Sequence, residues 1–349
     1  MSRQPPVVLL VEAVHAGLRA DAYLALKLPS VSRSRLKHKI MSGEALVNGH
    51  RLATSTRLRA GDRLAVSWSE DPSPPTGLEV LYEDDHLLAV NKPAGVPIHP
   101  AGRRQRGTII QSVRQAFRDQ IQRSLEAGDP GFYPSLVHRL DLFSSGVVLI
   151  AKDRSTLVAM HRKIATGGVS KRYLALVVGH VTPARGRIEA AIGRDESSPI
   201  GVKRCVRPDG LPAVTEYEVL ESFREHTLLA VFPLTGRQHQ IRVHLAWRGH
   251  PLWGDLIYLD ESLFLRYAAN GCKLDPTLPP RHGLHAECVR FRHPAGGREL
   301  ELAAPLAEDL ASVIAELRLP ASPGGDLWAA TAAEKKTPPG QRPAGLSSA

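Results

Sequence analysis

The sequence is poor in cysteine, and its three cysteines stand far apart. Cys205, Cys272 and Cys288 form no Cys-x-x-Cys pair, so neither a disulfide framework nor a zinc knuckle is indicated, and we expect buried, reduced thiols. No apolar run approaches the ~20 residues that are needed to cross a bilayer. The short apolar patch near the N-terminus is not followed by a cleavage site of small residues. These absences predict a cytoplasmic protein that has no membrane partner.

Basic residues are in excess, and the excess is uneven. The 349 residues include 45 Lys+Arg and 35 Asp+Glu, a net charge of +10. Residues 1–72 hold 11 of the basic and 6 of the acidic residues, which is half of the net charge in a fifth of the chain. This balance suits a polyanionic partner, although it also fits many ordinary basic proteins.

Changes in composition divide the chain into four parts. A chain of this length is expected to hold more than one domain. Prolines between Ser69 and Gly77 indicate a linker, because proline removes a backbone donor and interrupts regular structure. The residues beyond the last helical pattern are mostly Pro, Ala, Gly, Ser and Thr, which cannot bury enough surface to offset their ordering entropy. We therefore predict a module over 1–72, a linker over 73–77, a strand-rich domain over 78–318 and a disordered tail over 319–349.

The first part has the pattern of a small α/β module. Apolar residues at helical spacing within 18–40 predict two short helices, and 45–49 is a strand that runs into an Asn-Gly turn. A second strand is predicted over 62–67. The second helix carries four basic residues, Arg33, Arg35, Lys37 and Lys39.

Two interpretations of these four charges are possible. A run of charges by itself is most often a solvated helix face. However, the order of two helices, Ser-Arg-Ser and Gly-Glu-Ala-Leu-Val-Asn-Gly resembles the S-four-like RNA-binding module. In that module the basic second helix lies against RNA phosphates. The resemblance implies that the four side chains add affinity for RNA by releasing counterions, independently of sequence.

Four phrases in the strand-rich part are candidates for chemistry. Residues 88–99 are a buried strand that breaks into a Pro/Gly loop, and 136–152 place an aspartate on a short polar loop between two apolar runs. Residues 170–179 are a strand with one phenol, and 234–255 are rich in Arg and His. Each phrase alone also has an ordinary interpretation as a turn cap, a core tyrosine or a solvated helix.

Together and in this order, the four phrases closely resemble the RluA-type family of pseudouridine synthases. That family's hallmarks are H-R-L-D-x-x-[ST]-S-G, K-x-Y and G-R-x-H-Q-I-R-V-H, and they begin here at His138, Lys171 and Gly236. The match spans Leu78 to about Pro305. The strand-rich pattern and the resemblance predict an α+β catalytic domain on a mixed, largely antiparallel sheet, with the active site in a cleft across it.

The resemblance also implies a role for individual residues. Asp141 matches the catalytic aspartate, Tyr173 the active-site tyrosine and Arg242 the arginine that pairs with the aspartate. The loop around the aspartate also includes Arg139, Ser144, Ser145 and Gly146. The uracil must leave the ribose, rotate and reattach through carbon, so the carboxylate either attacks C1′ or takes the C2′ proton. No step is redox or hydrolytic, so we expect neither a cofactor nor a metal.

The expected partner is RNA, because the target is a nucleotide that must be flipped out of a helix or presented in a loop. Large-subunit ribosomal RNA is the first expectation and transfer RNA the second, and we expect the chain to act as a monomer. One departure concerns the residue after the aspartate. Leu142 stands where the family often has a basic residue that helps to displace the target base. We therefore expect the flipping step, or the RNA structure that is recognised, to differ.

Two other classes of protein share some of these features. A metal hydrolase is suggested by His239, His244 and His250, which lie near Asp255, but the spacings of five and six residues do not align on one helical face. A non-catalytic RNA-binding protein is equally consistent with the basic first part. It would have no need of the aspartate, tyrosine and arginine together.

Overall fold

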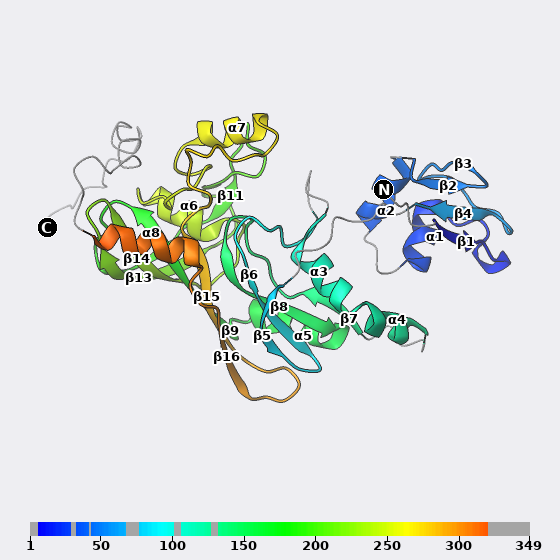
Figure 1. Ribbon diagram of the computed structural model, residues 1–349, viewed down its shortest axis with the longest axis horizontal. Helices are drawn as coiled ribbons and strands as arrows, with labels where there is room; N and C mark the ends of the chain where they lie inside the picture. Colours follow the sequence, from blue (N-terminus) through cyan, green and yellow to red (C-terminus); the bar gives the residue numbers. More distant parts are fainter. Residues whose placement is uncertain are drawn as a thin grey trace, which may run out of the picture. The chain divides into compact units, whose positions relative to one another are not determined.

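The computed structural model describes residues 6–28, 33–41, 43–67, 77–100, 106–126 and 132–319. The chain forms two compact units (Figure 1). The first contains Met1–Thr76 and Gly102–Gly107, and the second contains Gly77–Ala101 and Thr108–Ala349. The tail that the sequence predicts beyond Leu319 and most of the predicted linker lie outside the described residues.

The first unit has a four-stranded antiparallel sheet in the order β1-β4-β2-β3, together with two helices. Its elements are β1 (Val7–Leu10), η1 (Ala13–His15), α1 (Ala20–Lys27), α2 (Arg33–Met41), β2 (Ala45–Val47), β3 (His50–Arg51) and β4 (Arg63–Val66). Apolar residues at helical spacing, such as Leu24 of α1 and Leu36 of α2, are buried in one core with Leu64 of β4. Asn48 and Gly49 have φ angles of 50° and 84° and form the tight turn between β2 and β3.

The apolar patch near the N-terminus is an edge strand. Val7 to Leu10 pair antiparallel with β4, and the Tyr23 hydroxyl of α1 donates to the Leu10 carbonyl at 2.9 Å. The sequence pattern did not predict this strand. Its pairing partner lies more than 50 residues away in the chain, where no local pattern could indicate it.

The second unit is built on a ten-stranded sheet. The order is β10-β13-β14-β9-β15-β8-β6-β5, with β16 paired to β15 and β7 to β8. The strands are β5 (Glu79–Glu83), β6 (Leu87–Lys92), β7 (Phe132–Leu136), β8 (Ser145–Asp153), β9 (Val169–Val178), β10 (Arg185–Glu189), β13 (Val214–Ser222), β14 (His226–Pro233), β15 (Leu284–Arg292) and β16 (Glu299–Ala303). In the part of the chain that the structure describes, β15 and β8 are parallel and the other pairs are antiparallel. The predicted mixed, largely antiparallel α+β architecture is confirmed.

Six α-helices among the described residues belong to this unit, and they include helices on both faces of the sheet. They are α3 (Ile109–Ala116), α4 (Arg118–Glu126), α5 (Arg154–Ala165), α6 (Gln240–Trp247), α7 (Glu261–Ala269) and α8 (Glu308–Arg318), and a separate ribbon pairs β11 (Ile192–Arg194) with β12 (Arg204–Val206). Met160 of α5 packs in one core with Leu149 of β8, whereas Val113 of α3 packs with Ile150. Neighbouring residues of β8 face opposite cores, which explains why this strand is a continuous apolar run. Within the described ranges, none of the helices combines the length and the apolar character that a membrane-spanning helix requires.

One glycine sets how closely the two parallel strands approach. Gly146 lies opposite Ala286 of β15, and a Cβ at Gly146 would stand 2.1 Å from the Ala286 carbonyl oxygen. The φ angle of 110° at Gly146 is also one that side chains rarely adopt. Only glycine therefore allows β8 to begin beside β15, and this start fixes the loop that precedes it.

Candidate active site

Asp141 lies on the loop between β7 and β8 and lines a cleft of about 530 Å³. Its side chain is 20% exposed. Tyr173 of β9 and Arg242 of α6 line the same cleft. The structure thus brings together the three residues that the sequence analysis chose for catalysis, from segments that are about 30 and 70 residues apart.

Arg242 is the central charge of the site. Its Nη1 donates to Asp141 Oδ2 at 2.8 Å, while Nε and Nη2 donate to the two oxygens of Asp255 at 2.7 and 2.8 Å. Asp255 is fully buried and also accepts the backbone N–H groups of Ile257 and Tyr258. Because this bidentate pair fixes the guanidinium, Arg242 presents one N–H to Asp141 in a defined direction.

The arginine determines the charge of the aspartate. Burial works against ionisation of Asp141, but His239 and Arg242 together hold its pKa well below the usual range. Burial, followed by Arg242, lowers the pKa of His239 to about 4, so this imidazole is neutral at pH 7. The permanent charge of Arg242 is therefore the charge that keeps Asp141 ionised at neutral pH.

Lys92 supports the loop that carries Asp141. This residue at the end of β6 is fully buried, and its ammonium donates to the carbonyl oxygens of Pro93, Leu142 and Ser144 at 2.9, 3.0 and 2.7 Å. Burial and then Arg281 lower the pKa of Lys92 to about 7. Three carbonyls around one cation hold the backbone on both sides of Phe143 in place.

The two serines of the loop face inward. The Ser144 hydroxyl lies 2.8 Å from His282 Nε2, and Ser145 accepts a hydrogen bond from Arg281 and donates to His285 Nδ1 at 2.8 Å. Both serines are about 1% exposed. They attach the Asp141 loop to the segment that enters β15, so their contribution is to position the loop.

The remaining loop residues differ in their exposure. Arg139 is exposed and lines the cleft, whereas Leu142 is half-buried and its carbonyl also accepts the Gly95 N–H at 2.9 Å. Asp141 is the sole carboxylate among the described residues that line the cleft, while Lys171 and Arg237 add positive charge. The cleft is therefore suited to a polyanion.

Tyr173 stands between two apolar cores. Its ring packs against the core of α6 and against the core of α3. Burial, and then the charge of Asp141, raises the pKa of the Tyr173 phenol above its ordinary value. The hydroxyl is therefore neutral at physiological pH.

The roles of Asp255 and Lys92 were not predicted from the sequence. Both lie within the four phrases described above, but Lys92 was assigned no role and Asp255 was considered only beside the histidines of a metal hydrolase. An aspartate next to glycine and a lysine next to proline are compatible with an ordinary turn. The signal that distinguishes them is contact with a segment far away in the chain.

The histidines considered as metal ligands do not converge on one point. His244 contacts Thr215 and the Ala190 carbonyl at 2.9 Å each, and His250 contacts the Val178 carbonyl at 3.2 Å. In the described ranges, no group of three or more His, Cys, Asp or Glu side chains is placed to hold a metal ion.

The four basic residues chosen for RNA binding have different surroundings. Lys37 is exposed on α2. Lys39 is 5% exposed, and its ammonium contacts Glu44 Oε2 at 2.5 Å and the Ser67 carbonyl at 2.9 Å. Lys39 therefore stabilises the first unit, which corrects the expectation that it faces RNA. Arg33 and Arg35 belong to α2, but their side chains lie outside the described residues.

The fold and the site define an enzyme that holds an ionised carboxylate in a cationic cleft. Comparison with known proteins identifies the family. Residues 86–247 match the model described as RNA pseudouridylate synthase. The chain is 36% identical over 308 residues to the ribosomal large subunit pseudouridine synthase D of Xanthomonas campestris, which covers 87% of this chain and 90% of that protein. It is 35% identical to the ribosomal large subunit pseudouridine synthase C of Vibrio vulnificus, over 87% and 94% of the two chains.

A solved structure supports the same assignment. Human RNA Pseudouridylate Synthase Domain Containing 1 superimposes with a TM-score of 0.52 at 26% identity, and the match covers 71% of this chain and 97% of that one. The chain belongs to the RluA-type family of RNA pseudouridine synthases. It is an isomerase that converts uridine in RNA to pseudouridine.

Proposed function

We propose that this enzyme modifies large-subunit ribosomal RNA in the cytoplasm and that Asp141 is the carboxylate that acts on the ribose. The choice of RNA is supported by relatives named for that substrate, which align over about nine-tenths of this chain and of their own length. The choice of residue depends on one observation, the 2.8 Å hydrogen bond from Arg242 to an aspartate in the cleft.

The reaction requires an ionised carboxylate. The N1–C1′ bond breaks, the uracil rotates, the C5–C1′ bond forms, the proton on C5 leaves and N1 gains a proton. Whether the carboxylate attacks C1′ or removes the proton from C2′, it must carry a negative charge. Arg242 supplies the charge that maintains this state, and Asp255 holds Arg242 in place.

Tyr173 forms a wall of the cleft on which the uracil stacks. Because its phenol is neutral, it can accept the C5 proton only by passing its own proton on. We assign to Tyr173 this relay at the end of the reaction, and Tyr173→Phe separates the two parts of the role. The variant keeps the stacking surface and is expected to bind RNA normally while turning over slowly.

Phosphates of the RNA are bound by the positive charge of the cleft and by the first unit. Arg139, Lys171 and Arg237 line the cleft around Asp141. In the first unit, Lys37 of α2 has an exposed side chain. In an S-four-like module, a lysine at this position would contact phosphates of the RNA backbone. The target uridine then enters the cleft unstacked.

Release of tritium from [5-³H]uridine-labelled large-subunit ribosomal RNA tests the proposal, because the C5 hydrogen is lost only when C5 becomes bonded to C1′. Asp141→Asn is expected to fold and to bind the RNA, yet to release no tritium. Asp119→Asn, which removes an 89% exposed carboxylate of α4, is the matched control and should react like wild type. Tritium release by well-folded Asp141→Asn protein would refute the role of Asp141. Release from other RNAs but not from this one would refute the substrate.

A further inference from the structure

His239 occupies a constrained position beside Asp141. It directly precedes α6 and has a φ angle of 58°, in the left-handed region that is uncommon for residues other than glycine. Its side chain is 9% exposed, and Nε2 lies 3.9 Å from Asp141 Oδ2. The opposite ring nitrogen, Nδ1, lies 2.9 Å from the Tyr258 hydroxyl.

The contacts of the tyrosine identify which ring nitrogen carries the proton. The Tyr258 oxygen accepts the backbone N–H of Arg204 at 3.0 Å. Its own proton has one acceptor within reach among the described residues, which is His239 Nδ1. If Nδ1 carried a proton, the tyrosine oxygen would receive two donors while its own hydrogen remained unpaired. The imidazole is therefore the tautomer with hydrogen on Nε2, and that N–H faces the cleft.

The groups around the ring keep it neutral. Burial and the cation of Arg242 lower the pKa of His239, and Arg204 lowers it further. The negative charges of Asp141 and Asp255 raise it in part, and the resulting pKa is about 4. A protonated ring so close to Asp141 would compete with Arg242 for the carboxylate. A neutral ring leaves the carboxylate to Arg242 and still offers one donor.

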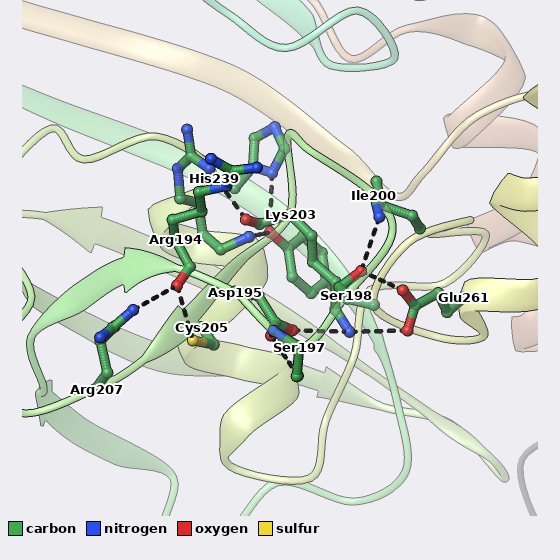
Figure 2. Close-up of polar contacts among 12 residues, drawn as sticks. Arg194, Asp195, Ser197, Ser198, Ile200, Lys203, Cys205, Arg207, His239 and Glu261 are labelled. Carbon is green, nitrogen blue, oxygen red and sulfur yellow. Dashed lines mark hydrogen bonds and ion pairs between the residues drawn. The ribbon is translucent and has the colours of Figure 1, made fainter.

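The β11–β12 ribbon fixes the tyrosine hydroxyl. Lys203, at the entrance to β12, contacts Asp195 and Glu261, each at 3.2 Å, and so attaches the ribbon to α7 (Figure 2). Arg204 follows directly, and its guanidinium donates to the Gln238 side chain at 2.6 Å, next to His239. The backbone N–H that orients Tyr258 therefore belongs to Arg204, whose own side chain and whose preceding neighbour, Lys203, are both held by contacts.

We propose that His239 donates a hydrogen bond from Nε2 to the O2 carbonyl of the target uracil. The proposal rests on the role assigned to Asp141. The carboxylate acts at C1′ or C2′, and O2 is attached to the carbon next to N1, so a donor 3.9 Å from Asp141 Oδ2 is within reach of O2 when the nucleotide is bound. When the N1–C1′ bond breaks, its electron pair stays on the uracil and negative charge spreads from N1 to O2. A fixed neutral donor at that oxygen stabilises the departing base without quenching the carboxylate.

His239→Gln and His239→Met test the donor under matched conditions, because both side chains meet the same backbone strain and only the glutamine retains an N–H. Single-turnover tritium release from the labelled RNA is expected to fall about 100-fold in His239→Met, with RNA affinity within twofold of wild type. His239→Gln should release tritium at least tenfold faster than His239→Met. Tyr258→Phe keeps the ring over Arg242 but no longer fixes the tautomer, so a fall of about 3- to 10-fold is expected.

The acceptor is tested with transcripts in which 2-thiouridine or 4-thiouridine replaces uridine, and the C-glycoside product is measured by mass spectrometry. Sulfur accepts hydrogen bonds weakly, so 2-thiouridine should slow wild type relative to 4-thiouridine and should not slow His239→Met further. A wild-type rate in folded His239→Met, or no advantage of glutamine over methionine, would overturn the inference. In that event an inactive Asp141→Asn would leave the role of Asp141 intact, whereas an active one would refute both.

Discussion

Asp141 and Asp255 share one guanidinium. Arg242 gives two of its donors to Asp255, which is fully buried, and one to Asp141, which is open to the cleft. Burial by itself would raise the pKa of Asp255, but the same arginine outweighs this effect, and the pKa of Asp255 is lowered to about 2. One residue of the pair therefore anchors the cation, and the other uses the charge for chemistry.

Removal of this cation should shift the activity of the enzyme to higher pH. Arg242 lowers the pKa of Asp141, so Arg242→Ala raises it, and the fraction of Asp141 that is ionised then increases with pH across a range where wild type is already ionised. We expect at least a 100-fold lower rate at pH 7, partly recovered as pH rises. The double variant with Asp141→Asn should be little worse than Asp141→Asn alone, because the two residues act as one unit.

The measurement is the pH dependence of single-turnover tritium release, with folding followed by circular dichroism. Loss of a buried partner also costs roughly 3–5 kcal/mol of stability, so the assay temperature must lie below the unfolding range of the variant. A pH profile for Arg242→Ala parallel to that of wild type would show that the arginine does not set the charge of Asp141.

Gly146→Ala should destabilise the second unit by roughly 3 kcal/mol or more, because the new Cβ would overlap the carbonyl of Ala286 and separate β8 from β15. Gly249→Ala is the control. It has a φ of 86°, but nothing lies within 4 Å of its added Cβ, so it carries only the backbone penalty of about 1 kcal/mol. Urea unfolding measures both variants. Equal losses would mean that the strands can move apart without cost.

Lys37→Ala should change RNA binding without changing stability, whereas Lys39→Ala should lower stability. Loss of the exposed Lys37 is expected to make RNA affinity less dependent on salt: the slope of log K against log salt concentration should become shallower by ~0.7–0.9. The free energy of unfolding should not change. Loss of the buried Lys39 should lower the stability of the first unit by about 2 kcal/mol, because Glu44 and the Ser67 carbonyl lose their partner. Filter binding from 50 to 300 mM salt and thermal unfolding provide the two readouts. An unchanged slope for Lys37→Ala would remove it from the RNA interface.

The free energy of unfolding should begin to fall on acidification at a pH well above the range in which carboxylates titrate. Burial lowers the pKa of His138 and His282 to about 3 and that of His239 to about 4, whereas each titrates near ~6.5 when unfolded. Between pH 6.5 and about 4 the unfolded chain binds protons that the folded chain excludes, so stability falls as pH falls.

We expect the free energy of unfolding to drop by at least ~2 kcal/mol between pH 7 and pH 5, since each such histidine contributes up to about 1.4 kcal/mol per pH unit. His282→Gln should reduce this dependence, whereas His161→Gln, at an exposed position of α5, should not. Urea unfolding at a series of pH values gives the slopes. A stability that stays constant down to pH 5 would show that these rings are protonated in the folded protein.

The features that depend on local chemistry can be predicted from the sequence alone. The continuous apolar run of β8, the Asn-Gly turn after β2 and the placement of Asp141 between two strands follow from neighbouring residues, and the structure contains all three. The order of the motifs was sufficient to indicate the family, because each motif is a local string. A glycine at position 146 could likewise be marked as a sharp entry into a strand, although the carbonyl that it must avoid could not be named.

Which charged side chains meet depends on how the chain folds and cannot be predicted from neighbouring residues. Lys39 looks like Lys37 in the sequence, yet one is buried against Glu44 and the other is exposed. Arg242 could have paired with Asp141 alone, but it is anchored by Asp255. Desolvation and Coulomb energy depend on distances of a few ångströms between segments that are far apart in the chain. Those distances exist only after the sheet and its helices have packed, and they set the ionisation of the site.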